Sequence, residues 1–572
     1  MSAIIPQRQK STRDAAMLKL SSQIDALTKE RNDLHLQIDK IDEKLSNIRA
    51  EFGAIYNEPS PLLNLPAEIT CLIFDYATIT PPGYGSNYLF SSRVQEDQRE
   101  PETTTELVLS HVCRRWREVA LSYPRLWARF MYREDENILG DELDLQRFET
   151  YLSRSGTQSL ELLLDFNDND FNPGRPNTTT SDNRARVLDM ALSHVARWRV
   201  VTIRVDFDFR VLNRLRHLTE QEVPKLEYFA FCPYPSMSRA HGTGDIEERF
   251  NLADRATALQ STIFTGGAPK LNYVHLGGYG KILPPLSNIT TLRLEAEDFA
   301  EYVLSWPAMR QIMDIPTLTN LSIVGNVFDP PAMEHDLPLI TMNVLEHLRY
   351  ENDAMTLLLP YLRLPALQSL VLRNVWLPEE LGQTVPVPVP KPGTGYFFPS
   401  LTTLTLIDST TSTVLAGRFF AHLTKRAKTV LLSIEEPEEN ILIPLYSYLP
   451  KECWPELSTL ILNLSTDDDV QLIIELATKG PNRRGKKVQV WLCDVLEKTW
   501  REDYRARFAR LEEACTIKTL SETPSSTLEA DEQCVWDMLS PVWPPASGER
   551  VYPGYTNNDD PFEIDLHSFT QF

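Results

Sequence analysis

The first regular pattern of the chain is a run of apolar residues in alternating steps of three and four. Only Arg31 breaks the run, and no glycine or proline interrupts it before Gly53. Such steps place side chains along one seam of an α-helix, and a seam of nearly six heptads is typical of a coiled coil. We therefore predict a disordered start over residues 1–14 and a coiled coil over residues 15–56. The seam consists of Met17, Leu20, Ile24, Leu27, Leu34, Ile38, Ile41, Leu45, Ile48, Phe52 and Ile55.

The sequence leaves the partner of this seam open. Isoleucine at a and leucine at d, as at Ile24 and Leu27, favour two strands, and Arg31 at an a position disfavours tighter bundles. In a parallel homodimer, Lys44 and Arg49 would meet as like charges across the interface. We expect pairing with a second helix, either in a coiled-coil dimer or with another protein. The alternative is a long helix folded back on its own domain.

A second pattern starts with "LPAEITCLIF", which begins at Leu65. Pro66 suits the first turn of a helix, where its missing N–H costs nothing. Ile69 and Ile73 recur on one face of that helix. The stretch that follows, "TPPGYGSNYLFSSRVQEDQREPETTT", is rich in proline, glycine, serine, threonine and charge, and it predicts a long loop.

Helical spacing returns in "LVLSHVCRRWREVALSYPRLW", which ends at Trp127. Leu109, Val112 and Trp116 recur on one face, and Pro124 ends the helix. A hairpin of about fifty ordered residues has too little interior to bury all these side chains alone, so its apolar face indicates a partner site. Six arginines and one glutamate lie between residues 107 and 133, and this local positive charge suits an acidic partner protein.

Taken together, "LPAEITCLIF" and "VCRRWREVA" with the later Leu-Trp pair resemble an F-box over residues 60–130, with a long internal loop. This loop, the preceding coiled coil and "FETYLSRSGTQSLELLLDF" are similar to the large F-box family of mushroom-forming fungi. The resemblance implies docking on the Skp-type adaptor of a cullin–RING ubiquitin ligase. It also implies that one of the two tryptophans faces inward. The adaptor-binding residues it implies are Leu65, Pro66, Glu68, Ile69, Ile73, Phe74, Leu109, Val112, Cys113, Trp116, Leu126 and Trp127.

A six-position phrase then recurs beyond about Trp198: apolar, two variable, apolar, one variable, apolar. It resembles an irregular leucine-rich-repeat solenoid over residues 140–520, in which each phrase is a short strand of one parallel sheet that must stack on its neighbours. The alternative is an ordinary α/β domain that contains many such strands. The clear copies are "LEYFAF", "LNYVHL", "ITTLRL", "LTNLSI", "LEHLRY", "LQSLVL", "LTTLTL" and "LSTLIL", with a weaker "TVLLSI".

The phrase also predicts two faces for the sheet. The apolar positions point inward and their neighbours outward, so a target protein would contact outward residues such as Thr402, Thr403 and Thr405. The repeats fade into "VQVWL", which we expect to be the last strand, and a charged helix follows it around residues 500–513. Residues 521–572 form an acidic, aromatic tail.

Composition and charge narrow the class of function. The net charge of −22 argues against a nucleic-acid partner, whose phosphates favour a basic domain. No run of 18 apolar residues occurs, which excludes a membrane-spanning helix, and the start lacks the apolar core of a signal peptide. The seven cysteines include no CxxC pair, so we expect reduced thiols and a cytoplasmic or nuclear location.

No motif for catalysis, a cofactor or a metal survives inspection. "DFNDND" has the residue types of a calcium loop, but Asp170 replaces its glycine and Pro176 replaces its bidentate glutamate. "GGYG" at Gly277 lacks both the dinucleotide fingerprint and the P-loop lysine. Histidines such as His275 show no metal-ligand spacing and are expected to be structural. We therefore expect a chain that is not an enzyme and holds neither cofactor nor metal.

The sequence predicts an α+β multidomain protein with an N-terminal coiled-coil helix, a small helical F-box and a C-terminal α/β leucine-rich-repeat-like solenoid. Its expected function is substrate recognition in a cullin–RING ligase of the SCF type. The F-box would dock on the adaptor, the solenoid would hold a target protein, and other subunits would transfer ubiquitin. The alternative is a non-catalytic interaction scaffold without ubiquitin machinery, in which the helical hairpin is a structural cap.

Overall fold

The computed structural model of the chain forms two compact units. Unit 1 comprises Met1–Tyr76 and Thr105–Ser122, and unit 2 comprises Ala77–Thr104 and Tyr123–Phe572. The predicted long internal loop falls outside the described residues, as do most of the "DFNDND" stretch and the last three positions of "GGYG". The structure describes residues 7–57, 60–78, 105–133, 141–166, 178–205, 214–233, 259–277, 282–296, 304–329, 337–351, 353–378, 397–411, 413–434, 444–450, 453–464, 473–476, 487–520, 538, 543 and 562.

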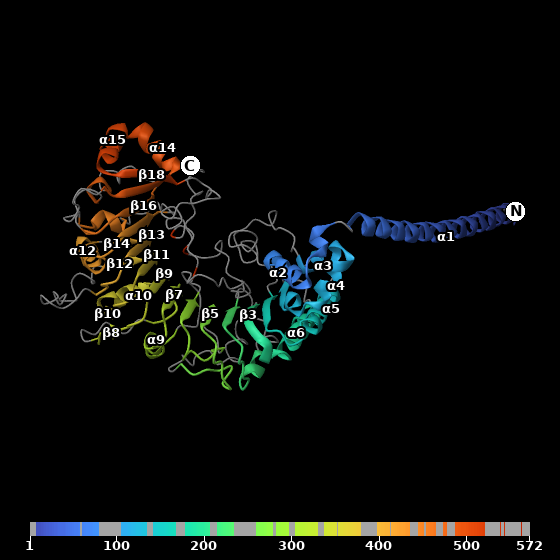
Figure 1. The fold of residues 1–572 in the computed structure, drawn as a ribbon, viewed down its shortest axis with the longest axis horizontal. Helices are drawn as coiled ribbons and strands as arrows, with labels where there is room; N and C mark the ends of the chain where they lie inside the picture. Colours follow the sequence, from blue (N-terminus) through green and yellow to red (C-terminus); the bar gives the residue numbers. More distant parts are fainter. Residues whose placement is uncertain are drawn as a thin grey trace, which may run out of the picture. The chain divides into compact units, whose positions relative to one another are not determined.

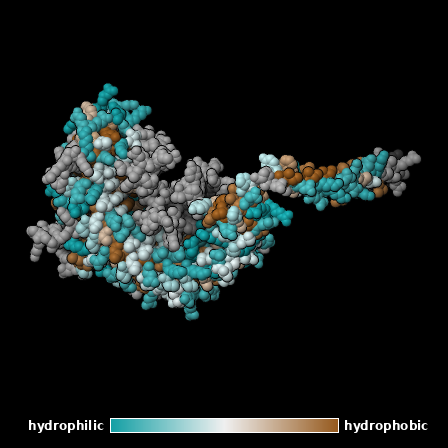
Figure 2. Space-filling model, in the orientation of Figure 1, coloured by the Kyte–Doolittle hydropathy of each residue, from teal (hydrophilic) through white to brown (hydrophobic). Residues whose placement is uncertain are grey.

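Unit 1 begins with one long helix, α1 (Gln7–Asn57). The helix starts upstream of the predicted boundary at residue 15, because no helix breaker follows Pro6 in the sequence. Its apolar seam is exposed throughout, and apolar side chains line α1 in Figure 2. The predicted N-terminal helix is confirmed, whereas its pairing with another helix stays a prediction.

The rest of unit 1 consists of a 3-10 turn and three short helices: η1 (Pro61–Asn64), α2 (Ala67–Thr78, whose last two residues belong to unit 2), α3 (Thr105–Val112) and α4 (Arg114–Ser122). The backbone N–H groups of Ile69 and Thr70 both donate to the carbonyl oxygen of Pro66, at 3.1 Å, so the proline opens α2 as predicted. At the break between α3 and α4, the Trp116 N–H approaches the sulfur of Cys113 at 3.4 Å.

Unit 2 is built on one parallel sheet, which contains fourteen strands in the described part of the chain. Each strand of this sheet pairs with the sheet strands before and after it in sequence (Figure 1). The strands are β1 (Arg129–Arg133), β2 (Leu160–Phe166), β3 (Trp198–Val205), β4 (Tyr228–Pro233), β5 (Tyr273–Gly277), β6 (Thr291–Glu295), β7 (Asn320–Val324), β9 (His347–Glu351), β11 (Ser369–Arg373), β13 (Thr403–Ile407), β15 (Thr429–Ser433), β16 (Thr459–Asn463), β17 (Gln489–Cys493) and β18 (Thr516–Leu520).

Helices and short turns connect these strands. Four short strands lie in the segments between strands of the long sheet, and they form two further sheets of two strands each: β8 pairs with β10, and β12 pairs with β14. The remaining elements are η3 (Pro124–Trp127), α5 (Asp141–Arg154), α6 (Thr178–Leu192), η4 (Val195–Arg197), η5 (Arg216–Leu218), α9 (Trp306–Met313), β8 (Ile340–Thr341), α10 (Asp353–Leu358), η7 (Leu359–Tyr361), β10 (Leu362–Arg363), β12 (Trp376–Leu377), β14 (Thr410–Thr411), α12 (Val414–Leu423), η8 (Leu445–Tyr448), α14 (Asp494–Asp503) and α15 (Arg505–Ala514).

Every copy of the six-position phrase holds a strand of the long sheet, and the predicted mixture of helix with a parallel sheet is confirmed. The apolar positions are buried: Leu345, Leu348 and Tyr350 of "LEHLRY", for example, are at most 1% exposed. A fully buried leucine stabilises a fold by roughly 1.5–3 kcal/mol. Because this layer recurs on every strand, it forms the core of unit 2.

The sheet begins before the predicted range of residues 140–520, and within that range it has one strand more than predicted after "VQVWL". β1 lies before residue 140, and β18 follows α15, so "VQVWL" in β17 is not the last strand. Neither "RFMYR" in β1 nor "TIKTL" in β18 contains the six-position phrase, which is why the phrase does not find them.

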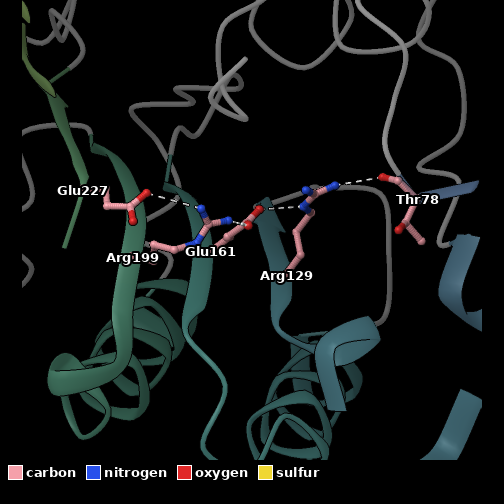
Figure 3. Close-up of polar contacts among 5 residues, drawn as sticks. All are labelled: Thr78, Arg129, Glu161, Arg199 and Glu227. Atoms are coloured by element: carbon pink, nitrogen blue, oxygen red, sulfur yellow. Dashed lines mark hydrogen bonds and ion pairs between the residues drawn. The ribbon is translucent and has the colours of Figure 1, made fainter. Parts of the chain in front are cut away.

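Alternating charges link the first strands of the sheet (Figure 3). Glu161 on β2 accepts from Arg129 on β1 at 2.9 Å and also pairs with Arg199 on β3. Arg199 reaches Glu227, just before β4, at 3.5 Å, and Arg129 donates to the carbonyl oxygen of Thr78 at 2.9 Å. The glutamates are mostly buried and the arginines partly exposed, so each buried carboxylate has a cation beside it.

A left-handed residue ends several strands. Gly325, Asn374 and Asp408 directly follow β7, β11 and β13 with φ of 70°, 47° and 45°. The backbone N–H of each donates to the carbonyl oxygen of the last residue in the following strand of the long sheet (β9, β13 or β15), at 2.8–3.0 Å. Glycine, asparagine and aspartate are the residues that tolerate this conformation best.

Gly325 offers a sharp test of this turn. A Cβ added there would lie 1.7 Å from the carbonyl oxygen of Ala296, whereas Gly156, also left-handed with φ 54°, has no atom within 4 Å of such a Cβ. We expect Gly325→Ala to lower the free energy of unfolding by about 3 kcal/mol or more and Gly156→Ala by about 1 kcal/mol. Urea unfolding followed by circular dichroism measures both; equal losses would contradict the described backbone.

Candidate partner-binding surfaces

The first candidate surface lies on α2 and α3 of unit 1. We define the α2–α3 surface by five exposed apolar residues, which recur at helical spacing within each helix. Figure 2 shows apolar surface in the region of α2. Two of them, Ile69 (43% exposed) and Val112 (54% exposed), are residues that the F-box resemblance assigns to adaptor binding. The surface consists of Ile69, Leu72, Tyr76, Val108 and Val112.

The other predicted adaptor-binding residues of unit 1 range from exposed to fully buried. Pro66 and Glu68 are exposed, and Leu65, Ile73, Cys113 and Trp116 are partly buried. Phe74 is fully buried, and its ring meets Trp116 edge to face with centroids 5.2 Å apart. Leu109 is also buried. Phe74 and Leu109 are therefore interior residues of unit 1, and the Phe74–Trp116 contact holds α2 against α4.

Leu126 and Trp127 lie in unit 2, and both are buried. The Trp127 ring is 1% exposed, stands edge to face on Tyr151 at 5.1 Å, and has the Arg154 guanidinium 4.4 Å from its centroid. Packing against α5 therefore removes this pair from any exposed surface of the chain. The expectation of one inward tryptophan is confirmed, because Trp127 is enclosed and Trp116 is partly exposed.

Three of the six arginines of the predicted basic patch lie in unit 1 and make contacts within it. Arg115 donates to the carbonyl oxygen of Leu65, and Arg117 donates to that of Ser110 at 2.9 Å. Arg114 pairs with Glu118 at 3.1 Å, one turn along α4. The contact of Arg115 joins α4 to the residue that precedes α2, so its side chain positions the α2–α3 surface as well as adding positive charge.

The second candidate surface is a row of side chains across the sheet of unit 2. Strand pairing aligns the fifth positions of the eight clear phrases with Leu431 on β15 and Trp491 on β17, and we call this alignment the inner row. Its middle is polar and its later part apolar. From β4 to β17 the row consists of Ala230, His275, Arg293, Ser322, Arg349, Val371, Thr405, Leu431, Ile461 and Trp491.

The predicted target-binding residues differ in their exposure to solvent. Thr402 is exposed and Thr403 partly so, but Thr405, in the inner row itself, is 3% exposed. Leu431, Ile461 and Trp491 are buried in one cluster with Ile407. The fifth positions of the phrases are therefore largely covered in this conformation of the chain, whereas second positions such as Thr402 remain exposed.

An imidazole lies between a thiol and a carboxylate at the start of the inner row. His275 approaches the Cys232 sulfur with its ring nitrogens 3.6 and 3.7 Å away, and its Nε2 lies 3.0 Å from Glu295. Burial alone would raise the pKa of Glu295, but Arg293 and His275 hold it well below its usual range. The four side chains join β4, β5 and β6 through compensated charges, in keeping with the structural role expected for His275.

Aligning the phrases by their fifth position would have revealed the inner row from sequence. The F-box motif gives no signal for the burial of the Leu126–Trp127 pair, because that depends on Tyr151 and Arg154 of a later helix. Within the described part of the chain, no group of three or more His, Cys, Asp or Glu side chains is arranged so that it could hold a metal ion, and no helix is long and apolar enough to cross a membrane.

No family model matches the sequence, and no curated protein matches it.

Phe74 and Ile69 form a matched pair for testing the interior of unit 1. Phe74→Ala removes a fully buried ring, so we expect it to destabilise the helices by about 3 kcal/mol. Ile69→Ala trims an exposed side chain of the same helix and should cost less than about 1 kcal/mol. Hydrogen exchange of amides in α2 and α4 measures both changes. Equal exchange in the two variants would contradict the assignment of Phe74 to the interior.

Proposed function

We propose that the chain is the substrate-recognition subunit of a cullin–RING ubiquitin ligase. The observation that carries the proposal is the α2–α3 surface, where apolar side chains of the F-box-like motif remain exposed on helices whose interior residues include Phe74 and Leu109. Exposed apolar surface of this kind marks sites for protein partners. A Skp-type adaptor is the partner that the motif implies, and a cullin would join through that adaptor.

In this proposal the docking residues are those of the motif that remain accessible in unit 1. Ile69 and Val112 supply apolar contact, and Pro66 with Glu68 lie beside them at the start of α2. Leu126 and Trp127 take a different role, because their burial in unit 2 makes them part of the packing around α5. The contact area then depends chiefly on the exposed faces of α2 and α3.

Unit 2 would act as the target-binding part, as a leucine-rich-repeat-like solenoid. The sequence order of its parallel strands and the buried leucine layer support this architecture. The chain would contribute proximity, because holding a target near a charged conjugating enzyme turns an encounter into an oriented, effectively intramolecular step. Ubiquitin transfer would take place on other subunits, in the cytoplasm or the nucleus.

Adaptor capture by the full-length chain tests the proposal. We expect immobilised wild-type chain to retain purified Skp-type adaptor. Pro66→Ala with Ile69→Asp should weaken retention by about tenfold or more, because the new carboxylate would be desolvated in the interface. Leu121→Asp is the matched control, since Leu121 is 44% exposed on α4 and outside the motif; it should bind like wild type.

Two outcomes would refute the proposal. One is failure of the wild-type chain to retain the adaptor although circular dichroism shows its helices folded; this favours an interaction scaffold without ubiquitin machinery. The other is equal loss of binding in the double variant and in Leu121→Asp, which would place the contact elsewhere.

A further inference from the structure

The tail of the chain contacts the inner row of unit 2 at its most basic point. Arg349 on β9 is 1% exposed, and its Nε donates to the Ser322 hydroxyl on β7 at 2.8 Å. The ring of Trp543 lies 4.2 Å from the Arg349 guanidinium carbon, and the ring of Phe562 lies 4.7 Å from it. Two aromatic rings from separate stretches of the tail thus pack on one fixed cation, an arrangement that is favourable when water is excluded.

A third tail residue contacts the apolar part of the same row. Met538 packs against the buried cluster that contains Leu431, Ile461 and Trp491. Trp543 and Phe562 are themselves buried, at 5% and 0% exposure. All three described residues of the tail therefore lie against the inner row, two of them on Arg349 and one on the cluster around Ile461.

The charge of the tail complements the surface that it covers. Residues 521–572 contain ten acidic residues and one arginine. In the middle of the inner row, Arg293 on β6 and Arg349 on β9 lie on either side of Ser322 on β7. Glu295 pairs with Arg293, whereas the two tail rings lie on Arg349. An acidic segment with spaced aromatic residues thus matches this surface both in charge and in apolar contact.

We propose that the inner row is a binding surface for acidic protein segments that carry aromatic side chains, and that the chain's own tail occupies it as an internal competitor. Arg349 is the central recognition residue, Ser322 positions its guanidinium, and the cluster around Ile461 accepts a further apolar side chain. A target of this chemistry must displace the tail. The inference concerns unit 2 alone and holds whether or not the α2–α3 surface docks on an adaptor.

Competition between the tail and a peptide tests this inference in the full-length chain. The probe is a fluorescein-labelled synthetic peptide of residues 535–568, and fluorescence anisotropy measures its binding. The Trp543→Ala, Phe562→Ala double variant should bind the peptide about tenfold or more tightly than wild type, because its own tail has lost both ring contacts. The control Trp536→Ala, Phe569→Ala removes the same residue types elsewhere in the tail and should bind like wild type.

Adding Arg349→Gln to the double variant should abolish peptide binding while the melting temperature shows the sheet still folded. Three results would overturn the inference: no binding by the double variant, equal binding by wild type and the double variant, or binding that survives Arg349→Gln. The first would identify the tail as a permanent cover of the sheet.

A separate observation, the charge pattern of α1, carries a second inference. Every described seam residue except Arg31 is an exposed large apolar side chain. A parallel pair of α1 helices would place Arg31 against its own copy in the core and Lys44 against Arg49 on the flank. Both contacts bring like charges together, and the core contact does so away from water.

An antiparallel pair avoids both contacts. In one antiparallel register, Met17 of one copy faces Ile55 of the second copy. All remaining a positions of the seam then face d positions, so Arg31 faces Ile41 of the second copy. On the flank, Glu30 comes within one turn of Lys44 of the second copy, twice by symmetry. We infer that two copies of the chain associate through α1 in antiparallel orientation.

Reversing one charge separates the two orientations. Lys44→Glu would oppose Glu30 in the antiparallel pair but attract Arg49 in the parallel pair. We therefore expect Lys44→Glu to weaken dimerisation of the full-length chain by roughly tenfold, with Lys40→Glu, on the outward side of the helix, as an unchanged control. Sedimentation equilibrium measures both. A tighter Lys44→Glu dimer, or a wild-type chain that stays monomeric at high micromolar concentration, would refute the inference.

Discussion

The stacking of one apolar layer on the next is the interaction on which the rest of this structure depends. A single strand with its connection cannot bury its own leucines, and each becomes stable only when the neighbouring strand covers its side. The strands therefore pair in parallel and in sequence order, and the apolar positions of the phrases are buried between them. The same pairing aligns the fifth positions of the phrases, so the register that builds the core also creates the inner row.

In the described part of unit 1, two apolar surfaces remain exposed. The seam of α1 and the α2–α3 surface both consist of side chains at helical spacing with a substantial exposed fraction. Exposed apolar area of this extent is costly for a chain that acts alone. The inner row is the opposite case, because tail residues of the same chain already cover it. A partner of unit 1 would thus add contacts to side chains that are now exposed. A partner of the inner row would replace the contacts that the tail now makes there.

Periodicity predicts the parts of the fold that repeat and misses those that do not. The helix α1 and the strands with the phrase follow from spacing alone, since each position recurs often enough to define a face. β1 and β18 carry no phrase, and their place in the sheet is seen only from their pairing with β2 and β17. The same limit applies to the candidate sites: Ile69 and Val112 are exposed, but Trp127 is enclosed by Tyr151 and Arg154, and nothing in the local motif encodes that contact.

The central claim is that the α2–α3 surface binds a Skp-type adaptor. Hydrogen exchange of the full-length chain, with and without saturating adaptor, tests it most directly because each element reports separately. The account predicts slower exchange in α2 and α3 on adding adaptor and unchanged exchange in β4–β17. Unchanged exchange in α2 and α3, or protection confined to the sheet, would contradict it.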